Sequence, residues 1–136
     1  MKVKAVVLAC VLALAVAPWA TAMAAGDSKY DVLELPAVPS ELASKSLIYS
    51  VKKFGDRYFA TGQHGHILYS NDAGDSWQQA QVPVSSAILD VDFPTPELGW
   101  AVGHEGVILH SSDGGKTWVK QYDGLRYGAE GLAYYQ

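Results

Sequence analysis

The sequence is poor in cysteine and arginine, and it has no sustained helical period after its N-terminal region. The only cysteine, Cys10, lies in an apolar N-terminal run and is interpreted as an apolar filler. The rest of the chain therefore has no disulfide framework and no cysteine metal site. The sequence also lacks a glycine-rich phosphate loop, a G-x-S-x-G elbow and an H-E-x-x-H motif, which removes the usual signatures of nucleotide, serine-hydrolase and metalloprotease chemistry.

The N-terminus has the layout of a secretory signal peptide over residues 1–24. Lys2 and Lys4 precede an uncharged run rich in alanine, valine and leucine, and small residues follow. We expect cleavage after Ala24, with Ala22 as the competing site, and an uncleaved membrane anchor as the alternative. Export without disulfides is compatible with a bacterial periplasm or a thylakoid-type lumen.

Positive charge is also scarce. Without the two lysines of the signal region, eight basic residues face fourteen acidic ones, a formal charge of −6. This balance argues against nucleic acid or anionic lipid as the main partner. About 112 residues remain, nominally enough for one small core.

The chain contains an internal repeat with an offset of 41 residues. "GQHGHILYSNDAGDSW" (62–77) aligns with "GHEGVILHSSDGGKTW" (103–118). Each unit holds four β-like runs separated by turn residues, and about 40 residues with four strands is the size of one β-propeller blade. We therefore predict an all-β fold with blades at 47–87 and 88–128. The predicted strands are Leu47–Lys53, Arg57–Thr61, His66–Ser70, Trp77–Gln81, Ile88–Phe93, Gly99–Val102, Val107–Ser111 and Trp118–Tyr122.

The repeated polar turn has a structural logic. Its aspartate can accept hydrogen bonds from backbone N–H groups of the turn, and its glycine permits positive φ. The tryptophan begins the next strand and can fold back over the hairpin, and the serine can cap the polar end. We interpret the turn as a staple without catalytic groups, formed by Ser70, Asp72, Gly74 and Trp77 in the first unit and Ser111, Asp113, Gly115 and Trp118 in the second.

These turns resemble the Asp-box, S-x-D-x-G-x-[ST]-W, of bacterial-neuraminidase-repeat (BNR) propellers. The longer string "GWAVGHEGVILHSSDGGKTW" (99–118) is similar to the repeat of the photosystem II stability/assembly factor family. This resemblance, over 47–123, implies a lumenal or periplasmic propeller that binds other proteins and helps to assemble a membrane complex. It implies a structural, non-catalytic role for the Asp-box. From the residues themselves we expect no cofactor and no bound metal.

A propeller closes with about four to eight blades, and this sequence supplies two. The 41-residue offset carries Ile88–Phe93 to Ala129–Tyr134, so residues 129–136 are predicted to start a third blade. We expect a truncated member with an incomplete propeller. A two-blade protomer that closes a ring by oligomerising is the alternative. Residues 25–46 are expected to be a linker or a closing strand.

Two other functions compete with protein binding. Asp90 and Asp92 lie about 6–7 Å apart along one strand face, a spacing that glycosidases use. We expect instead that Leu89, Val91 and Phe93 point inward and that both carboxylates are solvated. A sialidase-like site needs an arginine triad, and this sequence has only Arg57 and Arg126, so a hydrolase would require missing blades. The other competitor is a small oligomeric carbohydrate-binding lectin.

Histidines and aromatic residues are further candidates for a site. His64 and His66 are close in sequence, with His104 in the matching loop, but no set of metal ligands repeats between the units. His110 aligns with Tyr69 and is expected to be a packing residue. Aromatic side chains could form a sugar-stacking or protein-binding surface, although packing between blades is the expected role of Tyr58, Trp100, Tyr122, Tyr127, Tyr134 and Tyr135.

Overall fold

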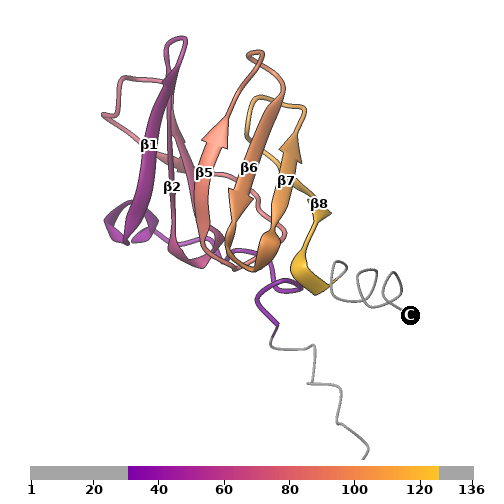
Figure 1. Cartoon of the computed structure of the whole chain (residues 1–136). Coiled ribbons are helices and arrows are strands. Elements are labelled where there is room, and N and C mark those ends of the chain that lie inside the picture. The colour runs from indigo at the N-terminus through magenta and orange to yellow at the C-terminus, as the bar shows by residue number, and fades with distance from the viewer. Residues whose placement is uncertain (1–30, 126–136) are drawn as a thin grey trace, which may run out of the picture.

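The computed structural model describes residues 31–125, which form two four-stranded antiparallel sheets (Figure 1). The strand order follows the sequence in both sheets, as in the meander of a propeller blade. The predicted all-β class is confirmed. The first sheet contains β1 (Ile48–Phe54), β2 (Arg57–Gly62), β3 (Ile67–Ser70) and β4 (Gln78–Gln79), and the second contains β5 (Ile88–Asp92), β6 (Gly99–Gly103), β7 (Ile108–Ser111) and β8 (Val119–Tyr122).

Two predicted segments, the signal peptide at 1–24 and the third-blade strand at 129–136, lie outside the described residues. Within 31–125, no helix has the length and apolar character needed to cross a membrane.

Strand boundaries agree with the sequence prediction to within one residue, except that β4 ends two residues earlier than predicted. This strand contains only Gln78–Gln79, because Gln81 pairs with the second blade instead. The Gln81 N–H donates to the Lys116 carbonyl at 2.9 Å, and the Trp118 N–H donates to the Gln81 carbonyl at 2.9 Å. The end of the first blade therefore crosses to the outer part of the second.

Each blade uses the same local devices. Short 3-10 turns, η3 (Gln63–Gly65) and η4 (His104–Gly106), connect the second and third strands. Their central residues, His64 and Glu105, both adopt left-handed backbone conformations, with φ of 58° and 57°. The innermost strand of each blade carries a register shift, between Ile48 and Ser50 in β1 and between Ile88 and Asp90 in β5.

The shift in β5 corrects one sequence prediction. Leu89 was expected to point into the core, but its side chain is 38% exposed, whereas Ile88 and Val91 are buried. A bulge adds one residue to a strand and so interrupts the period-2 alternation on which that prediction depended. The inward prediction for Val91 and Phe93 is confirmed, because both side chains are buried.

The main core lies between the two sheets. Phe59, Ile67 and Tyr69 from the first blade pack in one cluster with side chains of the second blade, Val91, Phe93, Ala101 and Leu109 among them. The rings of Phe59 and Phe93 stack at a centroid distance of 4.3 Å. The opposite face of the first blade forms a smaller cluster, in which Ala43, Ile48 and Trp77 cover Ala60 and Leu68.

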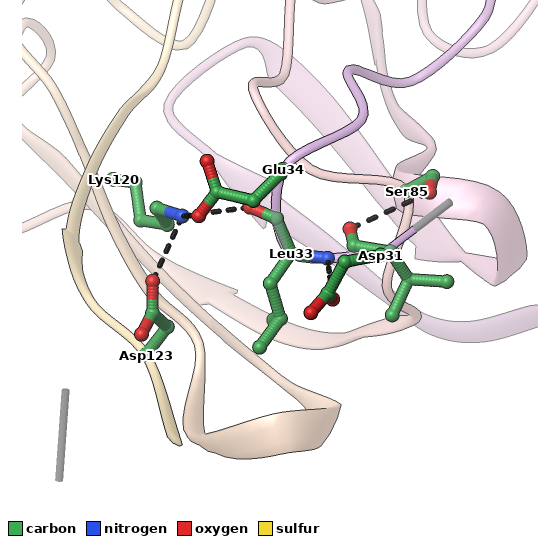
Figure 2. Close-up of polar contacts among 7 residues, drawn as sticks. Asp31, Leu33, Glu34, Ser85, Lys120 and Asp123 are labelled. Atoms are coloured by element: carbon green, nitrogen blue, oxygen red, sulfur yellow. Dashed lines mark hydrogen bonds and ion pairs between the residues drawn. The ribbon is translucent and has the colours of Figure 1, made fainter. Parts of the chain in front are cut away.

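Residues 31–46, here called the strap, run from the second blade to the first strand. They contain turns and the short helix η2 (Ala43–Lys45). Leu33 enters the main core, and the Ala37 N–H donates to the Val82 carbonyl at 2.9 Å. Lys120 of β8 donates to the Leu33 carbonyl at 2.7 Å and pairs with Glu34 at 2.9 Å and Asp123 at 2.8 Å (Figure 2). The strap therefore holds both blades.

Candidate functional site

The two Asp-box turns have matching hydrogen-bond networks. In the second box, the Ser111 hydroxyl donates to Asp113 at 2.9 Å and accepts from the Gly115 N–H at 2.9 Å. Asp113 also accepts from the Thr117 N–H at 3.0 Å and the Thr117 hydroxyl at 2.6 Å. The first box repeats this network with Ser70, Asp72, Gly74 and Ser76. The serine and the aspartate thus satisfy the polar groups of a tight turn.

These networks stabilise the charged form of both aspartates. Hydrogen bonds from the Ser76 side chain and N–H lower the pKa of Asp72 to about 2. Partial burial opposes ionisation of Asp113, but hydrogen bonds from the Thr117 hydroxyl and N–H outweigh it and lower its pKa to about 2. A carboxyl group with so low a pKa is a poor proton donor near neutral pH.

Each box contains two successive left-handed residues, Ala73 and Gly74 in the first and Gly114 and Gly115 in the second. The second box has no space for a larger residue, because a Cβ on Gly115 would lie 2.5 Å from Cε1 of Phe59. The corresponding Cβ on Gly74 would meet only Trp77, at 3.8 Å. The second turn is therefore pressed against the first blade, and the first turn is open.

Arg57 connects the second box to the first blade. Its Nη1 donates to the Gly114 carbonyl, and its Nε donates to Asn71 Oδ1 at 2.8 Å. The guanidinium carbon lies 5.0 Å from the ring centroid of Phe59 and 5.1 Å from that of Tyr69. Its buried Nη2 has no hydrogen-bond partner among the described residues, and the neighbouring rings are the groups that face the cation.

A cavity of about 370 Å³ opens beside Arg57, between the two blades. One wall is the β1–β2 hairpin with Phe54, and the other is the β5–β6 loop with Phe93. The Phe54 ring lies 5.3 Å from Phe93 and 6.1 Å from Phe59, so the floor is aromatic. The other lining residues are Gly55, Asp56, Pro94, Thr95 and Pro96. An apolar cavity with one cation at its edge fits an apolar side chain of a partner better than a sugar, which needs many polar contacts.

Asp90 and Asp92 do not form a catalytic pair. Asp90 accepts from the Ser50 hydroxyl at 2.9 Å and pairs with Lys52 at 2.7 Å, so it connects the two inner strands. Partial burial opposes its ionisation, but the Lys52 and Ser50 hydrogen bonds outweigh it and lower the pKa of Asp90. A glycosidase acid needs the opposite shift. Asp92 is exposed.

His66, His104 and His110 have packing roles, whereas His64 is exposed, with its ring centroid 5.9 Å from that of His66. His66 is buried and lies 3.2 Å from the Ser46 hydroxyl, and burial, followed by the charge of His64, lowers its pKa. His104 stacks on Tyr49 at 6.5 Å, and His110 lies against Trp100 at 4.5 Å. Within residues 31–125, no three histidine, cysteine, aspartate or glutamate side chains come together as a metal site.

The aromatic candidates are divided between two environments. Trp118 is 4% exposed, and its Nε1 donates to the Gly115 carbonyl at 3.1 Å, whereas Trp77 is half-buried. Trp100 is 43% exposed. Tyr58 lies near Lys53, whose Nζ is 5.5 Å from its ring centroid. Four other candidates, Arg126, Tyr127, Tyr134 and Tyr135, lie outside the described residues.

Sequence reasoning missed Arg57, Phe54 and the loop 94–96 as parts of one cavity. One signal was present: Arg57 aligns with Leu98, so an arginine replaces an aliphatic residue at one repeat position. Such a difference between units marks a residue that the repeat fold alone does not require.

Comparison with known proteins finds a matching family model and similar solved structures. Residues 71–131 match the family model described as photosynthesis system II assembly factor YCF48, which confirms the similarity predicted from the repeat. A solved structure described as YCF48 bound to D1 peptide is similar with a TM-score of 0.47 and 21% identity, over 54% of this chain and 24% of that one. The chain thus matches about a quarter of that protein's length. No curated protein matches.

Proposed function

We propose that this chain, whose residues 71–131 carry the YCF48-type repeat, is an exported, non-catalytic protein-binding module that assists the assembly of a membrane complex similar to photosystem II. The family match is the observation that carries this proposal. Export depends on the signal peptide predicted at residues 1–24. The Asp-boxes would serve as structural turns in such a protein.

The site favoured for the partner is the cavity between the blades. Its aromatic floor, formed by Phe54, Phe59 and Phe93, offers an apolar surface to a partner side chain. Arg57 is fixed at its edge by the Gly114 carbonyl and Asn71, so the cation is held without a partner being present. A preformed site of this kind loses little conformational entropy on binding.

Catalysis is the weaker candidate on specific grounds. Arg57, the one arginine within residues 31–125, is engaged in a contact between the blades. The low pKa values of Asp72 and Asp113 do not suit a general acid. A sialidase-like site would require three arginines aimed at one carboxylate.

The test is binding of overlapping peptides that tile the D1 protein, measured by fluorescence anisotropy. We expect at least one peptide to bind, and Phe54→Ser to weaken it at least tenfold because the floor of the cavity is lost. Pro96→Glu, on the exposed rim, should weaken binding without changing the core. The control is Val51→Ser, since Val51 is 59% exposed on the opposite face of the same strand. Equal binding by all four proteins would exclude the cavity, and no binding by any peptide would exclude D1 as the partner.

A further inference from the structure

The second Asp-box lies directly behind the aromatic floor of the cavity between the blades. A Cβ on Gly115 would lie 2.5 Å from Cε1 of Phe59 and 2.8 Å from Cζ of Phe93, so the turn is in close contact with both rings. The Trp118 ring, at the end of the same box, lies 5.9 Å from that of Phe93. The rings that a partner side chain would contact are therefore supported from behind by one turn.

Gly114 of this box binds both walls of the cavity through its backbone. Its N–H donates to the Glu97 carbonyl at 2.9 Å, in the β5–β6 loop whose residues 94–96 line one wall. Its carbonyl accepts from Nη1 of Arg57, which belongs to the other wall. A single residue of the Asp-box thus connects two hairpins that belong to different blades.

The first box shows that the turn itself does not require glycine at this position. Ala73 occupies the same repeat position and is also left-handed, with φ of 59° against 72° at Gly114. The turn therefore tolerates a Cβ. At Gly114, however, a Cβ would lie 2.7 Å from Nη1 of Arg57 and 3.2 Å from the Pro96 carbonyl oxygen. What excludes a side chain at Gly114 is therefore the close approach of the two walls.

The position of Arg57 depends on these turns. Within residues 31–125, no carboxylate lies at ion-pair distance from its guanidinium. Its hydrogen bonds go to the Gly114 carbonyl and to Asn71 Oδ1, and its other close neighbours are aromatic rings. An arginine side chain has many rotamers, so these two hydrogen bonds hold the guanidinium in one place.

Building on the proposed function, we propose that the second Asp-box positions the partner site as well as forming a turn. Gly114 holds Arg57 and the β5–β6 loop together, and so determines the separation of the walls that receive an apolar side chain of the partner. The Ser111 and Asp113 hydrogen bonds hold Gly114 in place, because they bind N–H groups of the residues that follow it. Such a preformed site loses little conformational entropy on binding.

The first test measures the position of Arg57 without a partner. NMR follows the solvent exchange of the Arg57 Nε–H, and Arg57→Lys distinguishes its signal from that of Arg126, the other arginine of the chain. We expect Gly114→Ala to speed this exchange at least tenfold, because the added Cβ displaces Nη1. The matched control is Ala73→Gly, the reciprocal change in the first box, which should leave the exchange unchanged.

The second test measures binding of a D1 peptide that binds the native chain. Gly114→Ala should weaken binding at least fivefold, and Ala73→Gly should leave it unchanged. Arg57→Leu, which introduces the residue found at the same repeat position of the second blade, removes the side chain that Gly114 holds. In that background Gly114→Ala should change binding less than twofold. A general loss of stability would instead weaken binding by the same factor in both backgrounds.

The outcomes separate this role of Gly114 from the proposed function. Unchanged Nε–H exchange in Gly114→Ala, or equal acceleration in Ala73→Gly, would overturn the positioning role, as would equal weakening of binding in both backgrounds. Absence of binding by every D1 peptide would contradict only the proposed function, since the exchange is measured without a partner. If Gly114→Ala does not fold, Gly114→Asn adds a Cβ on a residue that adopts the left-handed conformation more readily, and the same measurements apply.

Discussion

The first and second blades are built from one repeat, yet their equivalent faces meet opposite surroundings. Phe59 is 1% exposed and Trp100 is 43% exposed, although both occupy the same position in the second strand. The Asp-boxes differ in the same sense, since Gly115 lies against Phe59 while Gly74 has free space. The repeat thus determines the strands and turns, and the neighbouring blade determines which of their residues carry stability.

The largest expected effect separates the two equivalent aromatic residues. Phe59→Ala should lower the free energy of unfolding by about 3–5 kcal/mol, because it leaves a cavity in the main core. Trp100→Ala should cost less than about 1 kcal/mol, since its side chain is already partly in water. Urea unfolding followed by circular dichroism measures both. Similar losses of unfolding free energy in the two variants would contradict the difference in burial between Phe59 and Trp100.

The two Asp-box glycines should differ next. Gly115→Ala combines left-handed strain with a Cβ that overlaps Phe59, for an expected loss of about 3 kcal/mol. Gly74→Ala carries the backbone strain alone, for a loss of about 1 kcal/mol. Thermal unfolding of both variants checks this order. If Gly74→Ala proved the more damaging, the second box would not be pressed against the first blade as described.

The outer strands bind the strap through one repeat position, Gln79 in the first blade and Lys120 in the second. Lys120→Met removes contacts to Leu33, Glu34 and Asp123 and should cost about 2 kcal/mol. Gln79→Met removes two neutral hydrogen bonds, to Val38 and Ser40, and should cost about 1 kcal/mol. Denaturant unfolding measures the loss of unfolding free energy in each variant. Faster proteolysis of the strap in Lys120→Met, with the blades intact, would show that the lost stability comes from detachment of the strap.

The strands and turns of the two blades could be predicted from the sequence, whereas the β5 bulge and the length of β4 could not. The repeat and the turn residues predicted eight strands and the Asp-box positions, because Gly, Asn and Asp act locally through backbone conformation. The inward orientation of Leu89 was predicted wrongly, since a bulge has no strong sequence signature. The short β4 reflects a contact of Gln81 with the other blade, which is a tertiary effect.

The candidate site was the least accessible to sequence reasoning. Phe54, Arg57 and Phe93 come from two hairpins that meet only when the blades stack. Their side chains follow no shared period, and Arg57 departs from the repeat. Spacing arguments identify residues that recur within a unit, whereas this cavity depends on residues that differ between units.

The two aspartates should make folding acid-sensitive to different extents. Each has a folded-state pKa of about 2, against the ordinary aspartate pKa of 3.8, so the stabilisation is present above pH 3.8 and is lost as pH falls toward 2. Asp113→Asn should reduce the difference in urea midpoint between pH 6 and pH 2.5. Asp72→Asn should reduce it less, because Gly74 of the first box is not packed against the other blade as Gly115 is packed against Phe59. If both variants reduced the pH dependence of the urea midpoint equally, each box would stabilise only its own blade.

The smallest expected effect concerns the ion pair between the inner strands. Lys52 and Asp90 have side chains 38% and 45% exposed, so solvent screens their attraction. A double-mutant cycle with Lys52→Ala and Asp90→Ala should give a coupling energy of about 0.5 kcal/mol. Salt should reduce it further, while the loss in Phe59→Ala should be insensitive to salt. A coupling energy as large as the Phe59→Ala loss would mean that charge holds the blades together, whereas the expected small value leaves that role to the apolar contacts of the main core.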